Sequence, residues 1–259
     1  MNEPVLTQKY GTILQVTLNR PDAFNALNFE MMTRLGETLS HAAADASIQG
    51  VLLTGSGKAF CSGGDLKSIA QSSEDAASVL YRLAPQFHLS IMEIHRMKKP
   101  VIAAINGIAA GGGFSLALAC DFRVMAQSAT LRQAYTSSGL SMDGGGTFAL
   151  PRLVGLARAM EIMAFDQPIS STQALAWGLV TRVVADDLVI AESLSILNTI
   201  VQGALHSFGW SKRLMTDSLN STLETQLELE RQGISDCAAH PHGQEGIRAF
   251  IEKRKPIFR

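Results

Sequence analysis

The chain has 259 residues, enough for one large α/β domain or for one domain with a helical appendage. Its residues are 46% hydrophobic and 17% charged, with a net charge of -1, so we expect neither nucleic acid nor an acidic membrane as a partner. No basic segment with an apolar core and no apolar run of membrane-spanning length is evident, which predicts a cytoplasmic protein. Three widely spaced cysteines, Cys61, Cys120 and Cys237, favour reduced thiols over a disulfide framework or a zinc site.

The first predicted elements are a strand and a helix. Residues Thr12 to Leu18 form a β-branched run with partial alternation, which predicts a strand, and Asn19-Arg20-Pro21-Asp22 ends it. A helix is expected after Asn28, which is a suitable N-cap. Its apolar side chains recur at intervals of three and four residues, at Phe29, Met32, Leu35, Leu39 and Ala43.

The next unit is a short apolar strand, Gly50 to Thr54, that leads into a glycine-rich loop and a helix. The pair Gly57-Lys58 is similar to a phosphate-binding P-loop. However, Leu52 occupies the first glycine position of that motif, and Ala59 occupies the position of the magnesium-binding hydroxyl. These departures exclude nucleotide hydrolysis. Gly63-Gly64 instead leaves backbone N–H groups without side-chain cover directly after a strand.

A longer glycine-rich stretch runs from Met97 to Asp121. An apolar run is followed by a turn at Asn106-Gly107, by Gly111-Gly112-Gly113 and by an apolar helical run. Bare N–H groups at the positive end of a helix indicate a site for a negative group. That group is a phosphate or an oxyanion, although Leu116 stands where the dinucleotide fingerprint needs a small residue. Alternatively, the glycines only let the helix pack closely on a strand. Together with Gly63-Gly64, this loop has the donors to supply two N–H groups to one oxygen.

Two short strand-like pieces, Arg123 to Ala126 and Ala129 to Arg132, precede a loop that contains Asp143. This aspartate lies between a methionine and three glycines, in an apolar, hydroxyl-rich segment with few cations nearby in sequence. Such surroundings raise the pKa of a carboxyl group, which suits a general base that works near neutral pH. The alternative is an ordinary aspartate that caps a helix or forms a turn before glycine.

Beyond Gly155 the chain is predicted to be mostly helical. Ser221-Thr222-Leu223-Glu224 has the pattern of a capping box at the start of an amphipathic helix. A last helix is expected from about Gly243 to Lys253, and its basic end is typical of a solvated helix terminus or of a phosphate contact. His240 and His242 have no third ligand of matching spacing, so we expect no metal site.

Four segments together resemble the crotonase (enoyl-CoA hydratase/isomerase) superfamily, in order and over essentially the whole chain. They are Asn19-Arg20-Pro21 with Ala26-Leu27, Lys58 to Leu66, Lys99 to Gly107 with Gly111-Gly112-Gly113, and Glu245 to Arg254. The resemblance implies an α/β fold, with a crotonase-like spiral of ββα turns over residues 1–200. It implies a helical C-terminal region over residues 201–259 that serves trimerisation and active-site cover, and a homotrimer or a dimer of trimers.

The resemblance also implies acyl-CoA thioester substrates, with coenzyme A as the carrier of the substrate and no prosthetic group. The N–H groups of Gly64 and Gly112 fall on the oxyanion hole of the family, which holds the thioester oxygen as an enolate forms. Two sets of positions are expected to contact coenzyme A, the second from another subunit: Ala23, Ser62, Asp65 and Leu66, and then Phe250 and Lys253.

Departures from the family pattern bear on the reaction. Hydratases of the family carry two glutamates that activate water, and Ser115 and Tyr135 stand at those positions, which argues against ordinary hydration. Asp143 falls where a branch that includes ring-1,2-epoxyphenylacetyl-CoA isomerases carries a catalytic aspartate. The 4-chlorobenzoyl-CoA dehalogenases have a nucleophilic aspartate there, but they pair it with a tryptophan at the position of Tyr135. An apolar substrate pocket is expected to include Ser115, Tyr135, Leu140, Met142 and Phe148.

The main hypothesis is an isomerase that converts 3-enoyl-CoA to 2-enoyl-CoA, or isomerises a ring epoxide, with Asp143 as the base. One carboxylate suffices, because it can remove the proton alpha to the thioester and return it at the gamma carbon. The alternatives are an enoyl-CoA hydratase of the same fold, a non-catalytic acyl-CoA-binding member and a serine hydrolase. The last rests on Gly113-Phe114-Ser115-Leu116-Ala117, one residue away from a nucleophile elbow, with His240 or His242 as the base.

Overall fold

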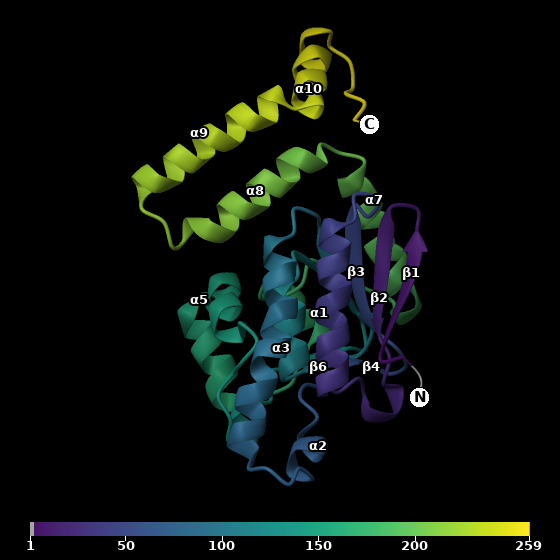
Figure 1. The fold of residues 1–259 in the computed structure, drawn as a ribbon, viewed down its shortest axis with the longest axis vertical. Coiled ribbons are helices and arrows are strands. Elements are labelled where there is room, and N and C mark those ends of the chain that lie inside the picture. Colours follow the sequence, from purple (N-terminus) through teal and green to yellow (C-terminus); the bar gives the residue numbers. More distant parts are fainter. Residues whose placement is uncertain (1–2, 259) are drawn as a thin grey trace.

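The centre of the protein is a six-stranded sheet, seen in a computed structural model that describes residues 3–258 (Figure 1). Its strand order is β1-β2-β3-β5-β7-β10, and only the β1–β2 pair is antiparallel. The strands are β1 Val5–Tyr10, β2 Ile13–Leu18, β3 Gly50–Gly55, β5 Val101–Ile105, β7 Phe122–Ala126 and β10 Arg182–Val184. The three central strands β3, β5 and β7 are almost wholly buried, as parallel strands covered on both faces require.

A second sheet of four short strands has the order β4-β6-β8-β9. These strands are β4 Ala59–Cys61, β6 Ile108–Ala110, β8 Thr130–Arg132 and β9 Ile169–Ser170. The chain alternates between the sheets, because β3 is followed by β4, β5 by β6 and β7 by β8, each time before a helix. This repetition is a spiral of ββα turns, and it confirms the expected fold.

Helices cover both faces of the large sheet and lie between the two sheets. They are α1 Phe29–Ala44, α2 Leu66–Ala70, α3 Ala76–Arg96, α4 Gly112–Ala119, α5 Gly146–Phe165, α6 Ser171–Ala176, α7 Val189–Val201, α8 Leu205–Ser218, α9 Leu223–Ala239 and α10 Pro241–Ile251. Helices α1 and α3 pack side by side on one face (Figure 1). Helix α7 covers the other face, where Leu197 joins a cluster with Leu52 and Ile102. Every residue of α4 is buried.

The predicted early elements agree with the structure. The expected strand is β2, and α1 begins where predicted, with the Asn28 side chain accepting a hydrogen bond from the Met31 N–H at 2.9 Å. The preceding strand β1 was not predicted, because it is an edge strand in which only Val5 is buried, so it lacks an alternating pattern.

Two helix boundaries near the C-terminus differ from prediction. The N-cap of α9 is Thr222, whose hydroxyl accepts from the Thr225 N–H, so Ser221 and Glu224 do not form the predicted capping box. The last helix is Pro241–Ile251, two residues earlier than expected at each end, because His240 caps it and Pro241 begins it.

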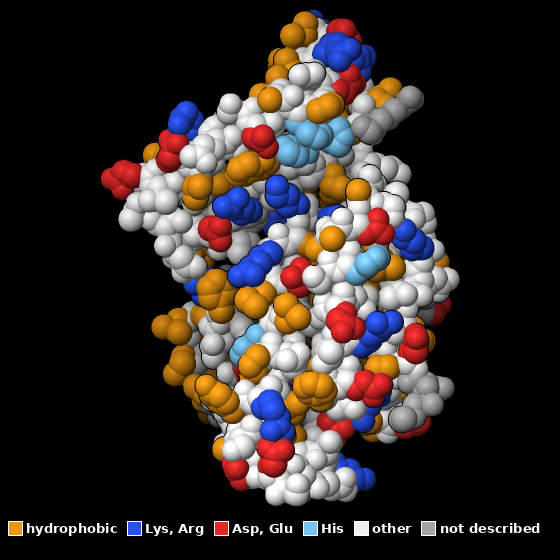
Figure 2. Space-filling model, viewed as in Figure 1, with side chains coloured by type: hydrophobic (Ala, Val, Ile, Leu, Met, Phe, Trp, Pro, Cys, Tyr) orange, Lys and Arg blue, Asp and Glu red, His pale blue; other side chains and the backbone are white. Residues whose placement is uncertain are grey.

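The C-terminal arm, defined as α9 and α10, extends away from the body over α8 (Figure 1). His206 of α8 stacks on His240 at 4.0 Å and contacts the Asp236 carboxylate at 2.9 Å, which joins the arm to α8. Figure 2 shows histidine side chains gathered below the arm. Large apolar side chains are exposed along the arm, at Leu223, Leu227, Ile234, Ile247, Phe250 and Ile251. Among residues 3–258, no single helix is long and apolar enough to cross a membrane. Asp186–Val201 and Leu205–Ser218 meet that criterion only together, across a 103° bend.

A buried ion pair fixes α8 to the body. Lys212 Nζ lies 2.8 Å from Asp121 Oδ2 and donates to the backbone carbonyls of Ile94 and Lys99. The same Asp121 oxygen accepts from the Val101 N–H at 2.8 Å. Burial raises the pKa of the Asp121 carboxyl group, while the Lys212 ammonium opposes that rise. One buried lysine therefore ties α8 to the end of α3 and to the start of β5.

We expect Lys212→Met to lower the free energy of unfolding by about 3–5 kcal/mol, because it leaves the Asp121 carboxylate buried without its counter-ion. The matched control is Arg213→Met, which removes an exposed cation from the next position of the same helix and is expected to cost less than about 1 kcal/mol. Urea unfolding followed by circular dichroism measures both. Equal losses in the two variants would contradict the anchoring role of Lys212.

Candidate active site

A cavity of about 380 Å³ lies beside the start of α4 and the N-terminal half of α3. Its lining residues are mainly apolar, with the two glycine loops on one part of the wall and the segment that leads to Asp143 on another. They are Leu27, Met32, Ser62, Gly63, Gly64, Leu66, Ile69, Leu80, Leu83, Ala84, Phe87, Gly111, Gly112, Ala134, Tyr135, Ser138, Leu140, Ser141, Met142 and Asp143. The cavity thus brings together most of the predicted pocket residues.

The first glycine loop is oriented by a bridge between Leu27 and Gly64. The Gly63 carbonyl accepts from the Leu27 N–H at 2.7 Å, and the Leu27 carbonyl accepts from the Asp65 N–H at 3.0 Å. Successive peptide groups in an extended chain point in opposite directions. The Gly64 N–H is therefore directed away from Leu27 and is left for a ligand.

The second glycine loop meets the first at the start of α4. A Cβ at Gly63, where φ is +104°, would lie 3.0 Å from the Ala110 carbonyl oxygen and 3.2 Å from the Gly112 nitrogen. Gly112 is the first residue of α4, so its N–H lacks a partner within the helix and lies at the positive end of the helix dipole. The two loops therefore hold two N–H donors close together.

Close packing explains the third glycine of the second loop. A Cβ at Gly113 would lie only 2.1 Å from the Cys61 carbonyl oxygen. Helix α4 can thus approach β4 only with glycine at this position. The close-packing interpretation of the glycine run is therefore confirmed at Gly113, and a site for a negative group at Gly112 stays a prediction. Cys61 itself is fully buried, and burial raises the pKa of its thiol to about 12, which fits a structural role.

Asp143 contacts a histidine that sequence reasoning missed. Asp143 Oδ1 lies 2.7 Å from Nε2 of His88, which comes from α3, and the two side chains are 43% and 45% exposed. The sequence shows few cations near Asp143, but the fold brings the His88 imidazole against its carboxylate. No sequence signal identified His88, because the two residues are 55 positions apart and His88 lies within an ordinary amphipathic helix.

Ser115 and Tyr135 lie next to Asp143, but only Tyr135 lines the cavity. The buried Ser115 hydroxyl donates to the Asp143 carbonyl oxygen at 2.6 Å, and the Tyr135 hydroxyl donates to the same oxygen at 3.2 Å. Burial raises the pKa of Tyr135 to about 12, so it is a protonated donor at neutral pH. Ser115 is placed behind the cavity wall, which corrects its assignment to the pocket.

The arrangement does not fit a serine hydrolase. The contacts of Ser115 Oγ are Tyr135 and a backbone carbonyl. His240 and His242 instead lie at the junction of α9 and α10, in the arm that extends away from the body over α8 (Figure 1). A nucleophilic serine needs a base within hydrogen-bond reach. Phe148 also lies outside the cavity, under the guanidinium of Arg152 at 3.6 Å, so its predicted place in the pocket is wrong.

Four of the six residues expected along coenzyme A lie together beside the cavity. Ser62 and Leu66 line it, and the Ser62 hydroxyl lies 3.5 Å from the Ala23 carbonyl oxygen. The Asp65 carboxylate caps α2 and pairs with Arg20 at 2.9 Å. The other two expected residues are in a different place, because Phe250 lies at the end of α10 and Lys253 follows that helix, and Phe250 is 85% exposed there.

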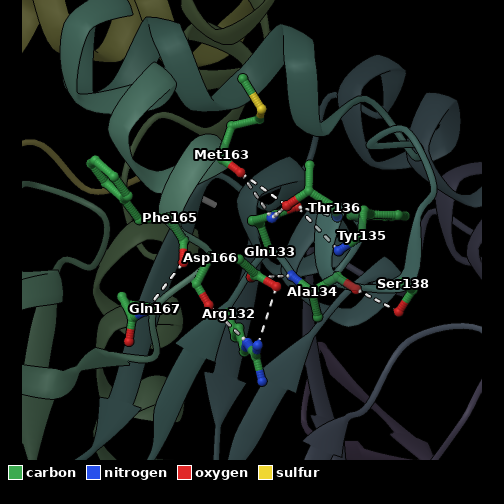
Figure 3. A network of polar contacts seen from close by, with 10 residues as sticks. All are labelled: Arg132, Gln133, Ala134, Tyr135, Thr136, Ser138, Met163, Phe165, Asp166 and Gln167. Atoms are coloured by element: carbon green, nitrogen blue, oxygen red, sulfur yellow. Dashed lines mark hydrogen bonds and ion pairs between the residues drawn. The ribbon is translucent and has the colours of Figure 1, made fainter.

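A polar network behind the cavity fixes the segment that carries Tyr135 (Figure 3). Asp166, at the C-terminus of α5, accepts from the Ala134 N–H at 2.8 Å and pairs with Arg132 at 3.2 Å. The Gln133 side chain accepts from the Tyr135 N–H at 3.1 Å. These contacts hold the chain from β8 onward against the end of α5 and so set the position of the Tyr135 ring.

Comparison with known proteins identifies the family. The family described as enoyl-CoA hydratase/isomerase matches residues 8–259. The chain belongs to this family. It is 34% identical to a 1,2-epoxyphenylacetyl-CoA isomerase of Escherichia coli K12, over all of this chain and 99% of the relative. It is 31% identical to 4-chlorobenzoyl coenzyme A dehalogenase-2 of an Arthrobacter species, over 93% of this chain and 88% of that protein.

The fold of a solved family structure agrees closely. A crystal structure of an enoyl-CoA hydratase from Polaromonas sp. JS666 superimposes with a TM-score of 0.93 at 36% identity, covering 98% of this chain and 99% of that one. These relatives are an isomerase, a hydratase and a dehalogenase. Membership of the enoyl-CoA hydratase/isomerase family therefore shows an enzyme that acts on CoA thioesters. It does not distinguish isomerisation, hydration and dehalogenation from one another.

We expect Gly63→Ala to lower the free energy of unfolding by about 1–3 kcal/mol, because its Cβ would press on the second glycine loop at an unfavourable φ. The control is Gly64→Ala, whose Cβ would meet no atom within 4 Å and is expected to cost about 0.5 kcal/mol or less. Thermal and urea unfolding of both variants measure this difference. A Gly63→Ala protein as stable as Gly64→Ala would show that the loops are not in tight contact.

Proposed function

We propose that this chain is an acyl-CoA isomerase that moves a double bond from the 3 to the 2 position, or isomerises a ring epoxide, through a thioester enolate. One observation supports this most. Among the described residues, Asp143 is the only carboxylate that lines the cavity, which it shares with the Gly64 and Gly112 amides. A single base beside two N–H donors is the minimum that a proton shift alpha to a carbonyl requires.

The proposed reaction is a proton transfer across three carbons. Asp143 removes the proton alpha to the thioester, and the electron pair moves onto the thioester oxygen to form an enolate. The Gly64 and Gly112 N–H groups stabilise that oxygen, each by roughly 3 kcal/mol in a dry pocket. The proton on Asp143 is then delivered to the gamma carbon, which moves the double bond into conjugation. Bound substrate on the apolar wall would displace the water that competes for the proton.

His88 orients the base. Its Nε2 lies against Oδ1 of Asp143, which leaves Oδ2 for the substrate carbon. A base held in one orientation reaches both the alpha and the gamma carbon from the same face. Addition of water, the reaction of the hydratases, needs a second group to position the water, and the cavity supplies no second carboxylate within residues 3–258. Hydration is therefore the less favoured alternative.

The His88–Asp143 contact favours a second candidate, hydrolytic substitution on an aromatic acyl-CoA. In that reaction Asp143 attacks the ring carbon and displaces halide, and His88 activates the water that releases the product from the ester. The relative named as a dehalogenase adds weight to this candidate. The isomerase remains preferred, because Tyr135 stands where the resemblance to dehalogenases requires tryptophan.

The proposal extends to the assembly. The C-terminal arm exposes Phe250 and other apolar side chains far from the cavity of its own chain (Figures 1 and 2). We propose a homotrimer or a dimer of trimers in which the arm, part of a helical region beginning near residue 201, covers the cavity of a neighbouring subunit. Phe250 and Lys253 would then reach the coenzyme A that the neighbour binds along Ser62 and Leu66. No prosthetic group takes part in this scheme.

We expect Asp143→Asn to reduce kcat for the conversion of 3-hexenoyl-CoA to 2-hexenoyl-CoA at least about a hundredfold, because the amide cannot accept the alpha proton. The control is Asp217→Asn, an exposed aspartate of α8, which should keep full activity. A spectrophotometric assay at the absorbance of the conjugated thioester measures both, with circular dichroism to confirm the fold. A fully active Asp143→Asn enzyme would refute its role as the base.

The same assay separates the alternatives. Rapid hydration of 2-butenoyl-CoA would favour a hydratase, and chloride release from 4-chlorobenzoyl-CoA would favour the dehalogenase. Binding of CoA thioesters without turnover of any of them would favour a non-catalytic member. Each of these results, obtained without isomerisation of the 3-enoyl substrate, overturns the proposal.

For the assembly, we expect light scattering after gel filtration to give the mass of a trimer or hexamer. Phe250→Ser should raise KM for the acyl-CoA severalfold, because it removes an apolar contact made by the arm. Leu6→Ser, which changes a side chain exposed on β1, should leave both mass and KM unchanged. A monomeric wild-type protein with full activity would contradict the role of the arm.

A further inference from the structure

Three donors meet at one backbone atom, the carbonyl oxygen of Asp143. Ser115 Oγ lies 2.6 Å away, the Tyr135 hydroxyl 3.2 Å and the Gly146 N–H 3.2 Å. The two hydroxyls are also 3.2 Å from each other. A carbonyl oxygen has two lone pairs, so this one is fully occupied. The backbone at Asp143 is therefore held by side chains from two distant parts of the chain.

The two hydroxyls come from rigid parts of the fold. Ser115 lies in the first turn of α4, which is buried along its whole length. Tyr135 lies at the end of the network that Asp166 and Gln133 fix behind the cavity (Figure 3). Ser115 has no exposed surface and does not line the cavity, so any influence it has on substrate must pass through its hydrogen-bond partners, Asp143 and Tyr135.

The segment after Asp143 lacks this rigidity. Gly144 and Gly145 both have positive φ, at +62° and +73°, in a region where glycine is free to change conformation. A Cβ at Gly144 would overlap the Phe87 ring, and a Cβ at Gly145 would lie 3.4 Å from the Ile91 side chain. Without the hydroxyl contacts, the Asp143 carbonyl would keep only its hydrogen bond from the Gly146 N–H, across a turn of two glycines.

Helix α4 links the base to the oxyanion donors. Gly112 and Ser115 are three residues apart, so they lie on the same side of the helix, within one turn. Gly112 presents its N–H to the cavity, and Ser115 holds the Asp143 carbonyl. One rigid turn thus sets the spacing between the atom that would receive negative charge and the backbone of the residue that would receive the proton.

We propose that Ser115 and Tyr135 are positioning residues that fix the Asp143 backbone through its carbonyl oxygen and so align its carboxylate with the Gly64 and Gly112 amides. This inference rests on the proposed role of Asp143 as the base. In this proposal the Tyr135 hydroxyl holds the Asp143 carbonyl and does not contact substrate, although the Tyr135 ring lines the cavity. The buried Ser115 likewise affects turnover without touching substrate.

The test compares Ser115→Ala and Tyr135→Phe, each of which removes one hydroxyl and little volume. We expect each to lower kcat about ten- to hundredfold, with KM within twofold of wild type, because a displaced base slows proton transfer without weakening thioester binding. The double variant should lose less than the product of the two single losses, since both hydroxyls act on one oxygen. Exchange of the alpha proton of hexanoyl-CoA in deuterated water, followed by mass spectrometry, should slow in parallel.

The matched control is Ser193→Ala. Ser193 is also fully buried, and its hydroxyl donates to the Val189 carbonyl at 2.7 Å on α7, away from the cavity. It should lose stability in urea unfolding to the same extent as Ser115→Ala and keep wild-type kcat. If Ser115→Ala fails to fold, Tyr135→Phe and its exchange rate decide the question alone.

The outcomes separate the two proposals. Full activity of the Asp143→Asn enzyme would refute the role of Asp143 as the base, and with it the positioning role of Ser115 and Tyr135. An inactive Asp143→Asn enzyme together with wild-type kcat in Ser115→Ala and Tyr135→Phe overturns the positioning role alone. A rise in KM for Tyr135→Phe, with no effect of Ser115→Ala, also overturns it, because Tyr135 would then act directly on substrate.

Discussion

The close approach of two backbone loops is the constraint on which the rest of this structure depends. Strands β4 and β6 are parallel neighbours, so the glycine loops that follow them emerge at the same edge of the small sheet. Their contact depends on two glycines: a Cβ at Gly113 would overlap the Cys61 carbonyl oxygen, and a Cβ at Gly63 would press on the Ala110 carbonyl oxygen at 3.0 Å. The tight contact fixes where α4 begins and which N–H groups it presents.

The opposite end of α4 is completed by a buried cation. Arg123 Nη1 donates to the Cys120 carbonyl at 2.5 Å, and its Nε donates to the Leu179 carbonyl at 2.6 Å. The guanidinium thus satisfies a carbonyl at the negative end of the helix, where a positive charge is favourable. Helix α4 carries only one polar side chain, Ser115, and is wholly buried, with Arg123 as the partner of its C-terminal carbonyl.

Much of this fold was predictable because it follows from local patterns. The β2 strand, the Asn28 cap and the paired glycine loops each depend on residues close together in the chain. His88 could not be found in this way, since its partner Asp143 is in contact only after α3 packs beside the cavity. The position of Ser115 outside the pocket could not be predicted either. The sequence places Ser115 on the same helix as Gly112, but it does not indicate which side of that helix faces the cavity. The resemblance to a family located the site, but the contacts among its residues came from the fold.

The oxyanion donors that we propose, at Gly64 and Gly112, are main-chain N–H groups, and this has a consequence for how the scaffold can diversify. A substitution cannot delete a backbone amide, so the ability to hold a negatively charged oxygen is insulated from most mutations outside a few glycines. The proposed base and its supports are side chains on α3, on the first turn of α4 and on the segment before α5, where a single replacement would change the reacting group. Evolution or design can thus replace the side chain that reacts with substrate while the backbone amides that would bind the thioester oxygen stay unchanged.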